Sequence, residues 1–314
     1  MIYNNGRGMD RKFKKVAVLK GGISSEREVS LRSGGAIAKG LREGGYEVLE
    51  IDITSRMFAI PEGIEAVFIA LHGQFGEDGE IQQKLSEMDM PFTGSGAESS
   101  RVSFDKILTR ERLIENGIPV AKGEVLTHAE GRTIPVPLVV KPPREGSSVG
   151  CYLVFEDHAW ESAFEGAAQY SGEALVETFI PGRELTVGVV DGQVLPVVEI
   201  KPASEWYDFN AKYVTGDTQY VVPAELDDET TAYLQSLALK TFEALEAEGF
   251  GRIDFRLTPE GMPYVLELNA IPGFTATSLL PKAAQAAGIG FSDLCCRIME
   301  LASTHKKSRK QPVA

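Results

Sequence analysis

Residues 251–281 read GRIDFRLTPEGMPYVLELNAIPGFTATSLLP, and this stretch gives the strongest indication of both fold and chemistry. Its β-rich runs, residues 251–255 and 265–269, flank a turn that contains proline and glycine, which predicts two antiparallel strands. An exposed hairpin held by cross-strand ion pairs is the alternative interpretation. Asp and Asn are depleted in strands, so their presence here favours a functional hairpin.

Side chains alternate between the two faces of a strand, which puts the polar residues of this hairpin on one side. If the turn is centred on residues 260–261, Asp254 lies opposite Glu267 and Arg252 lies opposite Asn269. Two carboxylates and an amide oxygen form a hard oxygen site that suits Mg²⁺. A bulge of one residue at the turn would shift the pairing, so the register is a hypothesis.

Three loops have compositions suited to contact with a ligand. Residues 269–281 leave the second strand with backbone N–H groups and hydroxyls that could hold a carboxylate or an oxyanion. Residues 141–150, KPPREGSSVG, follow a Val-rich strand and could surround phosphates, although they do not match the P-loop motif. Residues 206–213 form a long polar connection with aromatic side chains and a lysine, as in lids over sites. Read alone, each of them could also be only a loop.

The N-terminal third alternates strands with helical patterns. Strands are expected at residues 16–19, 48–53 and 66–71, and a helix from a capping box at Ser25 and Glu28 to about Glu43. This order predicts a parallel sheet with helices on its faces. Ligands bind beyond the carboxyl ends of such strands, which here means residues 22–28 and 72–79.

The remainder of the chain is richer in antiparallel signals. A helix is expected at residues 103–116 and another at 227–248, and Asp191-Gly192 indicates a hairpin turn. Short β-rich runs are expected at residues 136–140, 174–179, 185–190 and 194–200. These patterns predict an α/β protein divided as residues 1–96, 97–182 and 183–314, with a parallel sheet in the first part and β-rich runs in the other two; the family resemblance described below implies that these two are mainly antiparallel.

The composition is that of an ordinary globular protein, with 43% hydrophobic and 25% charged residues. A net charge of −13 disfavours a nucleic-acid partner, since such proteins usually carry a basic face. No apolar run approaches the ~18 residues that would span a membrane. The three cysteines contain no CxxC pair and no disulfide framework, which favours free thiols in a reducing cytoplasm.

Taken in order, these motifs resemble the ATP-grasp ligases, and within them the D-alanine–D-alanine ligase family. The resemblance extends from residue 16 to residue 301. It rests on GGISSEREVS at 21–30, LHG at 71–73 with GEDG at 76–79, the loop at 141–150, and residues 177–184, 207–213 and 251–281. The resemblance implies the ATP-grasp fold, with ATP clasped between the two antiparallel domains.

The resemblance also implies cofactors and their contacts. Two magnesium ions are expected, with manganese able to replace them. Their implied ligands are Asp254, Glu267 and Asn269. The implied ATP contacts are Lys106, Lys141, Ser147, Glu177, Phe179, Ile180, Glu184, Lys212 and Leu266.

The implied reaction joins two D-alanines through an acyl phosphate, for peptidoglycan precursor synthesis. Glu26 would bind the ammonium group of the first D-alanine and form a hydrogen-bonded link with Ser147 and Tyr213. Arg252 and the Gly273 N–H would hold the oxyanion. The implied catalytic residues are Glu26, Ser147, Tyr213, Arg252, Gly273 and Ser278. The implied substrate contacts are Glu26, His72, Tyr207, Arg252, Gly273, Ser278 and Leu279.

Three alternatives stay open beside this interpretation. A ligase of the same fold could use D-lactate or D-serine as acceptor, although Tyr213 favours D-alanyl-D-alanine. A nucleotide-binding protein without ligase activity is disfavoured by the joint presence of the metal ligands and Arg252. A dehydrogenase is disfavoured because no GxGxxG motif follows the first strand. The family resemblance also suggests a homodimer.

Overall fold

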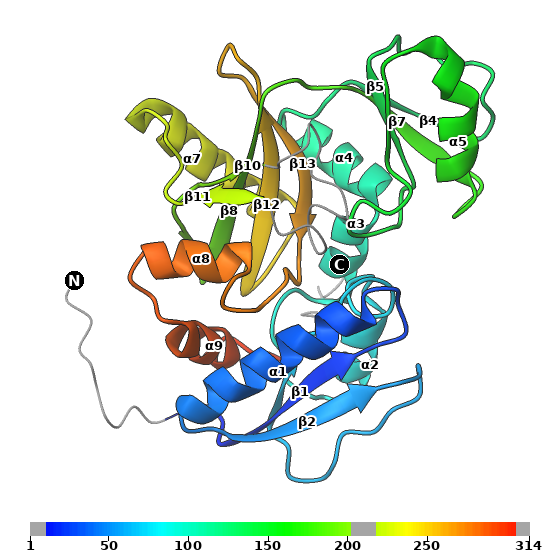
Figure 1. Cartoon of the computed structure of the whole chain (residues 1–314). Helices are drawn as coiled ribbons and strands as arrows, with labels where there is room; N and C mark the ends of the chain where they lie inside the picture. The colour runs from blue at the N-terminus through cyan, green and yellow to red at the C-terminus, as the bar shows by residue number, and fades with distance from the viewer. Residues whose placement is uncertain (1–10, 202–217, 306–314) are drawn as a thin grey trace, which may run out of the picture.

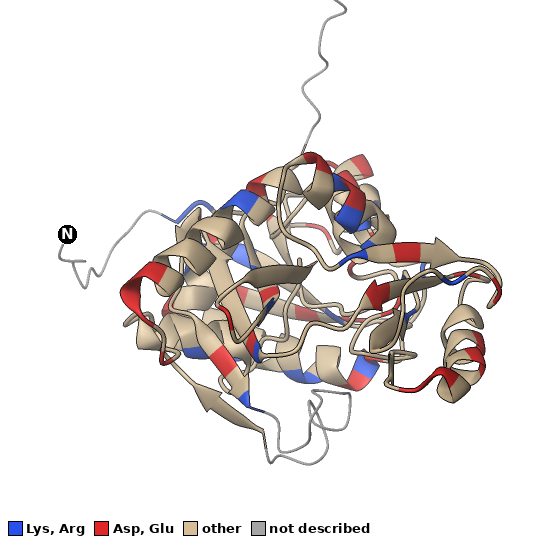
Figure 2. Ribbon diagram, turned by 90° about the horizontal axis from the view of Figure 1, so that it is seen from above, with Lys and Arg blue, Asp and Glu red and all other residues tan. Residues whose placement is uncertain are grey.

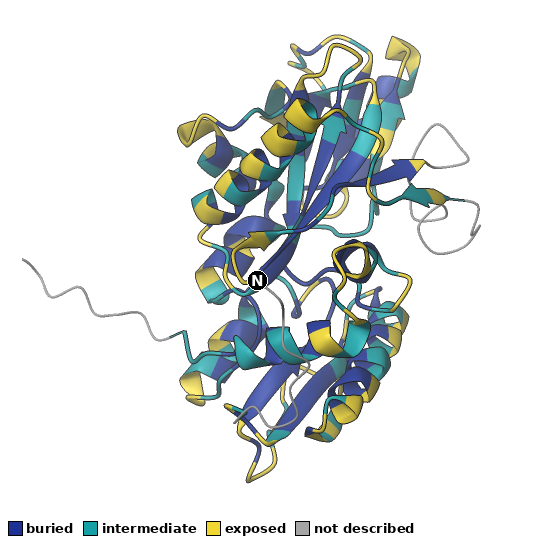
Figure 3. Cartoon of the chain, turned by 90° about the vertical axis from the view of Figure 1, so that its left-hand side faces the viewer, coloured by how far each residue is buried: buried dark blue, intermediate teal, exposed yellow. Residues whose placement is uncertain are grey.

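The computed structural model describes residues 11–201 and 218–305. The secondary-structure elements form three separate sheets with helices packed against them (Figure 1). Buried residues concentrate in the strands, while the outward faces of the helices are exposed (Figure 3). Seen from above, acidic and basic residues are interspersed along the elements (Figure 2). None of the described helices is long and apolar enough to cross a membrane.

The N-terminal sheet is parallel, as expected. Its order is β2-β1-β3, with β1 (Lys15–Gly21) central between β2 (Glu47–Ile53) and β3 (Ala66–Ile69). Helix α1 (Arg27–Glu43) connects β1 to β2, and α2 (Glu80–Glu87) follows β3. The loops after β1 and β3 leave the same edge of the sheet, which brings residues 22–28 and 72–79 together.

The predicted capping box at the start of α1 is wrong. The N-cap residue is Glu26, and its side chain makes no cap hydrogen bond. Its carboxylate instead accepts from the Ser147 hydroxyl. Ser24, not Ser25, supports the turn, because its hydroxyl accepts from the Glu26 N–H at 3.2 Å and donates to the His72 carbonyl at 2.6 Å. The helix end agrees with expectation, since α1 stops before Gly44 and Gly45.

The predicted helix at residues 103–116 is two helices. Helix α3 (Ala97–Phe104) ends before Asp105, and α4 (Lys106–Glu115) begins after it. Asp105 has an extended backbone, and its Oδ1 accepts from the N–H groups of Ile107 and Leu108, so it is the N-cap of α4. Its Oδ2 accepts from Arg144 Nε at 2.7 Å, which connects this break to the loop at residues 141–150.

A four-stranded antiparallel sheet forms the middle of the chain. Its order is β4-β7-β5-β6, and the core beneath it includes Trp160 and Phe164 of its helix. The elements are β4 (Gly123–Leu126), β5 (Leu138–Lys141), β6 (Tyr152–Val154), the short 3-10 helix η1 (Asp157–Ala159), α5 (Trp160–Ala168) and β7 (Ala174–Thr178). The sheet carries the loop at residues 141–150 at the end of β5.

A six-stranded antiparallel sheet forms the C-terminal part, with the order β11-β10-β8-β12-β13 and β9 paired to β8. The predicted Asp191-Gly192 hairpin is present, with φ of 53° and 68° at its two turn residues. The strands are β8 (Arg183–Val190), β9 (Gln193–Val194), β10 (Val198–Lys201), β11 (Gln219–Val221), β12 (Phe250–Leu257) and β13 (Pro263–Asn269). Helix α7 (Asp228–Ala244) buries Leu234, Leu237 and Phe242 against one face of the sheet.

The register of β12 and β13 agrees with the sequence-based expectation. Arg252 lies opposite Asn269, and Asp254 lies opposite Glu267. A bulge occurs after Asp254, because Phe255 pairs with Val265 and Leu266 is left as the extra residue of β13. The outer half of the hairpin is centred on Glu260, and the bulge between it and the polar residues adds the one residue that produces the expected pairing.

The last helices return to the N-terminal sheet. Helix α8 (Leu279–Ala286) begins at the end of the 269–278 loop, and α9 (Phe291–Glu300) packs on α1. Leu294, Cys295 and Ile298 of α9 belong to the same buried cluster as Ile37 and Leu41 of α1. The division into three domains stays a prediction.

Candidate active site

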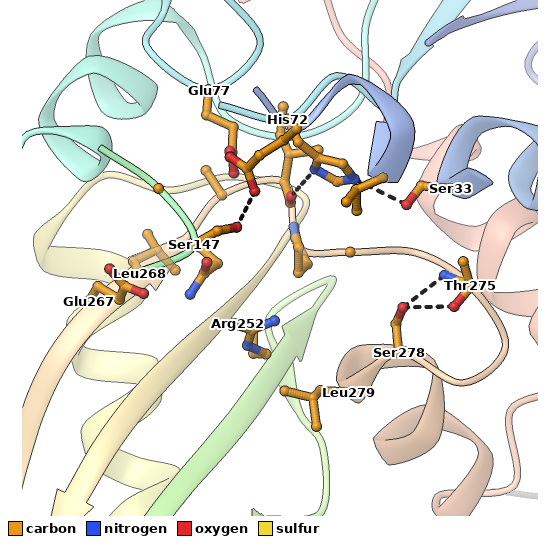
Figure 4. A pocket seen from close by; sticks show the side chains of 18 of the residues that line it. Ser33, His72, Glu77, Ser147, Arg252, Glu267, Leu268, Thr275, Ser278 and Leu279 are labelled. Atoms are coloured by element: carbon orange, nitrogen blue, oxygen red, sulfur yellow. Dashed lines mark hydrogen bonds between the residues drawn. The ribbon is translucent and has the colours of Figure 1, made fainter. Parts of the chain in front are cut away.

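A pocket of about 490 Å³ lies where the loops of the N-terminal sheet meet the ends of β12 and β13. The sequence-predicted residues that line it come from all three parts of the chain. They are Glu26, His72, Lys106, Ser147, Arg252, Glu267, Asn269, Gly273, Ser278 and Leu279. Folding therefore brings residues separated by more than 200 positions to one cavity, and Figure 4 shows Ser147, Arg252 and Ser278 around it.

Two carboxyl groups meet on the N-terminal side of the pocket. Glu26 is buried and accepts from the Ser147 hydroxyl, and Glu77 points toward the same space (Figure 4). Glu77 Oε2 accepts from the Gly73 N–H at 2.6 Å. Burial, together with the negative charge of Glu26, raises the pKa of Glu77 to about 8. The pocket therefore holds one carboxyl that is protonated near neutral pH.

The β12–β13 ladder forms the opposite side. Arg252 donates to both oxygens of Asp254, with Nε and Nη2 each at 2.8 Å, and Asn269 Nδ2 donates to Asp254 Oδ2 at 2.8 Å. Lys106 Nζ lies 3.8 Å from Glu267 Oε2 and donates to the Glu145 carbonyl at 2.6 Å. The paired strands thus carry a guanidinium, two carboxylates and an amide within one patch, and α4 contributes the ammonium group of Lys106 beside them.

The chemistry of this donor set fits a hard divalent cation. Asp254 and Glu267 supply carboxylate oxygens on facing strands, and Asn269 keeps its amide oxygen available because its bond to Asp254 uses the nitrogen. Within residues 11–201 and 218–305, no group of three or more His, Cys, Asp or Glu side chains is arranged to hold a metal. The amide oxygen of Asn269 is therefore the group that could join the two carboxylates in binding a cation.

A second polar cluster lies between the two antiparallel sheets. Glu177 is buried and accepts from Lys141 Nζ at 2.5 Å and from Arg110 Nη1 at 2.6 Å. Arg256 contacts Glu184 at 3.5 Å and donates to the Ile180 carbonyl at 3.1 Å. The Arg256 guanidinium also lies 5.7 Å from the centre of the Phe179 ring, within the range of a cation–π contact. The implied ATP contacts in this region are thus close to one another, and Leu266 is half-buried at the bulge.

The loop after β13 forms the third side. Gly273, Ser278 and Leu279 line the pocket, and Ser278 is the N-cap of α8. The Ser278 hydroxyl accepts from the Thr275 N–H at 3.0 Å, which holds the loop in a tight turn before the helix (Figure 4). A helix N-terminus presents unpaired N–H groups and a partial positive charge, so this side suits a carboxylate.

Comparison with known proteins identifies the family. A family model described as the D-ala D-ala ligase C-terminus matches residues 111–300. A D-alanine–D-alanine ligase of Methylacidiphilum infernorum is 44% identical over 92% of this chain and 95% of its own length. One of Syntrophotalea carbinolica is 45% identical over 93% and 97%.

The chain belongs to the D-alanine–D-alanine ligase family.

Solved structures agree with this assignment. A D-alanine–D-alanine ligase from Bacillus anthracis superposes with a TM-score of 0.82 at 34% identity, covering 92% of this chain and 97% of that one. The same ligase complexed with ATP gives a TM-score of 0.80 at 32% identity, with the same coverage. VanG, a D-Ala:D-Ser ligase from Enterococcus faecalis, gives 0.81 at 27% identity over 92% and 99%. The predicted ATP-grasp α/β fold is therefore confirmed.

In this D-alanine–D-alanine ligase family member, several residues of the pocket and of the cluster around Glu177 and Glu184 have no role predicted from the sequence. Glu77 lies within the quoted GEDG motif but was given no role, because its neighbour Glu26 is visible only in three dimensions. Arg256 continues the alternation of Arg252 and Asp254 along β12 and could have been found from that spacing. Ser33 and Lys282 carry no local motif, and both line the pocket. Tyr207, Lys212 and Tyr213 lie outside the described residues.

Proposed function

We propose that this chain joins two molecules of D-alanine to D-alanyl-D-alanine at the expense of ATP, in the cytoplasm, for peptidoglycan precursor synthesis. The observation that supports it best is the β12–β13 register, which pairs Arg252 with Asn269 and Asp254 with Glu267 at the edge of a pocket that Glu26 and Ser147 also line. The family membership supports the same reaction. The names of the curated relatives specify D-alanine as the substrate.

ATP would lie between the two antiparallel sheets with its phosphates toward the pocket. Lys141 and Lys106 would contact the phosphates, and Glu177, Phe179, Ile180, Glu184 and Leu266 would surround the adenosine. The ion pairs of Lys141 and Arg110 with Glu177 fix these side chains before ATP arrives, which reduces the ordering cost of binding. The Bacillus anthracis ligase complexed with ATP supports ATP as the nucleotide bound.

Magnesium would be held by Asp254, Glu267 and Asn269, with two ions expected and manganese able to replace them. The ions would neutralise phosphate charge during transfer. The residues themselves contribute a preset geometry, since cross-strand pairing fixes the distance between the two carboxylates.

The first step would make an acyl phosphate. Glu26, held by Ser147, would bind the ammonium group of the first D-alanine and direct its carboxylate toward the γ-phosphorus. A carboxylate oxygen attacks that phosphorus, the bond to ADP breaks, and the phosphoryl group becomes the leaving group of the second step. Tyr213 and Lys212 would complete this side from the predicted lid.

The second step would form the peptide bond. The neutral amine of the second D-alanine attacks the acyl carbon, and the tetrahedral intermediate collapses with release of phosphate. Arg252 is oriented by its two bonds to Asp254 and would stabilise the oxyanion together with the Gly273 N–H. One such donor contributes about 3–4 kcal/mol to the barrier reduction. Ser278 and Leu279 at the start of α8 would hold the second carboxylate, and His72 and Tyr207 are further predicted substrate contacts.

The test is an assay of phosphate release from ATP and Mg²⁺ with D-alanine, L-alanine, D-alanine plus D-lactate, or D-alanine plus D-serine. Products are identified by mass. We expect phosphate release that requires D-alanine and a product with the mass of D-alanyl-D-alanine. A mixed product in preference to the dipeptide would instead favour the alternative ligase, for which the likeness to VanG is the supporting observation. ATP turnover that does not depend on D-alanine would contradict both.

The assembly and domain organisation are also proposals. We infer a homodimer from the family, and three domains at residues 1–96, 97–182 and 183–314. The three separate sheets support this division. Sedimentation of the purified protein would establish the oligomeric state.

A further inference from the structure

A buried chain of hydrogen bonds connects α1, the loop after β3 and the loop after β13. The Phe274 N–H donates to Ser33 Oγ at 3.1 Å, and Ser33 Oγ lies 3.0 Å from His72 Nε2. The other ring nitrogen, His72 Nδ1, lies 3.1 Å from the Ile271 carbonyl (Figure 4). Ser33 is fully buried and His72 is 4% exposed. These hydrogen bonds therefore hold the loop after β13 on both sides of Gly273.

In the neutral form of His72, the donor and acceptor roles of these groups determine where each proton in the series of hydrogen bonds lies. A carbonyl oxygen can only accept, so His72 Nδ1 carries the ring proton and donates to Ile271. His72 Nε2 must then accept, and the Ser33 hydroxyl donates to it. The Ser33 oxygen accepts in turn from the Phe274 N–H. Burial lowers the pKa of His72 to about 4, which keeps the ring in the neutral form that this pattern requires.

The same loop is held from its other side by aromatic packing. The Phe274 ring is buried, with centroids 5.8 Å from Phe68, 6.0 Å from Phe250 and 5.7 Å from Phe291. Packing fixes the side chain of Phe274, and the hydrogen bond to Ser33 fixes its backbone. Gly273 precedes it in the chain and has no side chain to anchor it. The orientation of the Gly273 N–H therefore depends on its neighbours.

We propose that Ser33 and His72 are positioning residues that hold the 271–274 loop so that the Gly273 N–H faces the oxyanion. This inference rests on the proposed function and revises the expected role of His72. Both ring nitrogens of His72 are used by protein groups, so it acts on the loop and not on the substrate. An oxyanion donor works only within a few tenths of an ångström of its ideal distance, and a displacement of about 1 Å can cost about 100-fold in rate.

The decisive comparison is Ser33→Ala with Ser30→Ala. Ser30 lies one turn earlier on α1, is equally buried, and donates to the Ala70 carbonyl at 2.6 Å, so its hydroxyl bonds to the end of β3 and not to the 271–274 loop. We expect Ser33→Ala to lower kcat for dipeptide formation by about 10- to 100-fold with an unchanged KM for ATP. Ser30→Ala, with a comparable loss of thermal stability, should keep kcat within about threefold. Equal losses of kcat in the two variants would overturn the proposal.

Two histidine variants separate the two connections. His72→Asn keeps a donor near the Nδ1 position, and His72→Gln keeps an acceptor near the Nε2 position. His72→Asn breaks the same connection as Ser33→Ala, so the double variant should be no slower than the slower single variant. Multiplied losses in the double variant would show two independent effects and would contradict a shared connection.

A measurement independent of activity distinguishes failure of this proposal from failure of the proposed function. Amide hydrogen exchange of the Phe274 N–H should accelerate at least tenfold in Ser33→Ala and stay unchanged in Ser30→Ala. If the wild-type protein made no dipeptide while this exchange result held, the ligase assignment would fail and the connection would stand. Unchanged exchange at Phe274 in Ser33→Ala would overturn the connection itself.

Discussion

Glu267 is the residue whose loss tests the metal assignment most directly. Its carboxylate faces Asp254 across the ladder, and Lys106 lies 3.8 Å away. Glu267→Gln removes a charge without changing side-chain size, so we expect a loss of activity of at least 1000-fold, on the order expected for a lost electrostatic contact in the transition state. The measurement is dipeptide formation at several Mg²⁺ concentrations. Glu260→Gln, an exposed change in the turn of the same hairpin, is the control and should behave as wild type.

Glu77 predicts an unusual dependence of stability on pH. Its pKa is raised from 4.5 to about 8 by burial and by Glu26, so between these values the folded state binds a proton that the unfolded state has lost. The free energy of unfolding should therefore fall as pH rises from 6.5 to 8, and Glu77→Gln should remove this slope. Urea unfolding across that range measures it. Glu87→Gln, an exposed change on α2, should retain the slope; an unchanged slope in Glu77→Gln would refute the assignment.

His72 has the opposite dependence at lower pH. Its folded pKa of about 4 lies below its ordinary value of 6.5, so the unfolded chain takes up the proton first as pH falls. Stability from this residue is complete above pH 6.5 and is lost as pH falls toward 4, by up to about 3 kcal/mol. The raised pKa of Glu77 acts in the opposite direction over much of this range, so the quantity to measure is the difference in free energy of unfolding between wild type and His72→Asn at each pH. This difference should shift in favour of His72→Asn by up to about 3 kcal/mol as pH falls from 6.5 to 4. A difference that stays constant over this range would contradict a buried neutral His72.

Among elements, the break between α3 and α4 depends on Asp105. Its carboxylate caps α4 and pairs with Arg144, and it is 7% exposed. Asp105→Ala should lower the free energy of unfolding by about 1–2 kcal/mol, measured by urea titration. Asp105→Asn keeps an acceptor for the cap but loses the charge that faces Arg144, so its loss should be smaller. Equal losses of unfolding free energy in Asp105→Ala and Asp105→Asn would mean that the ion pair with Arg144, and not the cap of α4, is the stabilising contact.

The contrast between elements shows what the sequence could predict. Strand alternation and the position of one turn predict the pairing of Asp254 with Glu267, but the observed pairing also depends on the bulge at Leu266. The predicted start of α1 is wrong because Ser25 and Glu28 match a capping pattern that the folded chain does not use. The N-cap residue is Glu26, and its carboxylate accepts from Ser147, which is 121 residues away in the sequence. Asp105 was read as part of one helix because a capping aspartate and an exposed helical aspartate look alike in sequence.

The site could be predicted only as far as its residues lie in recognisable segments. The hairpin patch followed from spacing, and the distant partners Glu26 and Ser147 required the family resemblance. Ser33 belongs to a helix whose pattern indicates only burial, so neither spacing nor motif distinguishes it from Ser30. Its contact with Phe274 spans 241 positions and exists only in the folded chain.

At the scale of the whole molecule, the packing of α9 on α1 joins the two ends of the described chain. Gly40 of α1 lies against α9, and a Cβ atom there would be 2.9 Å from Cys295 Sγ and 3.2 Å from the Phe291 ring. Gly35, on the same helix, has nothing within 4 Å of such an atom. Gly40→Ala should destabilise the protein by about 1–2 kcal/mol through overpacking, and Gly35→Ala should be neutral or stabilising by up to about 1 kcal/mol. Thermal unfolding measures both, and stabilisation by both would show that α9 can move away at no cost.

The bulge at Leu266 has a consequence for how the hairpin tolerates change. Val265 and Leu268 are both buried in the core, although strict alternation would put residues three apart on opposite faces. The extra residue reverses the pattern between them, and so Glu267 and Asn269 can face the pocket while both apolar neighbours stay inside. The ladder thereby consists of two separately aligned halves. A change of length in the turn between the strands would alter the pairing in the outer half of the hairpin. The inner half, which carries Arg252, Asp254, Glu267 and Asn269, would keep its alignment.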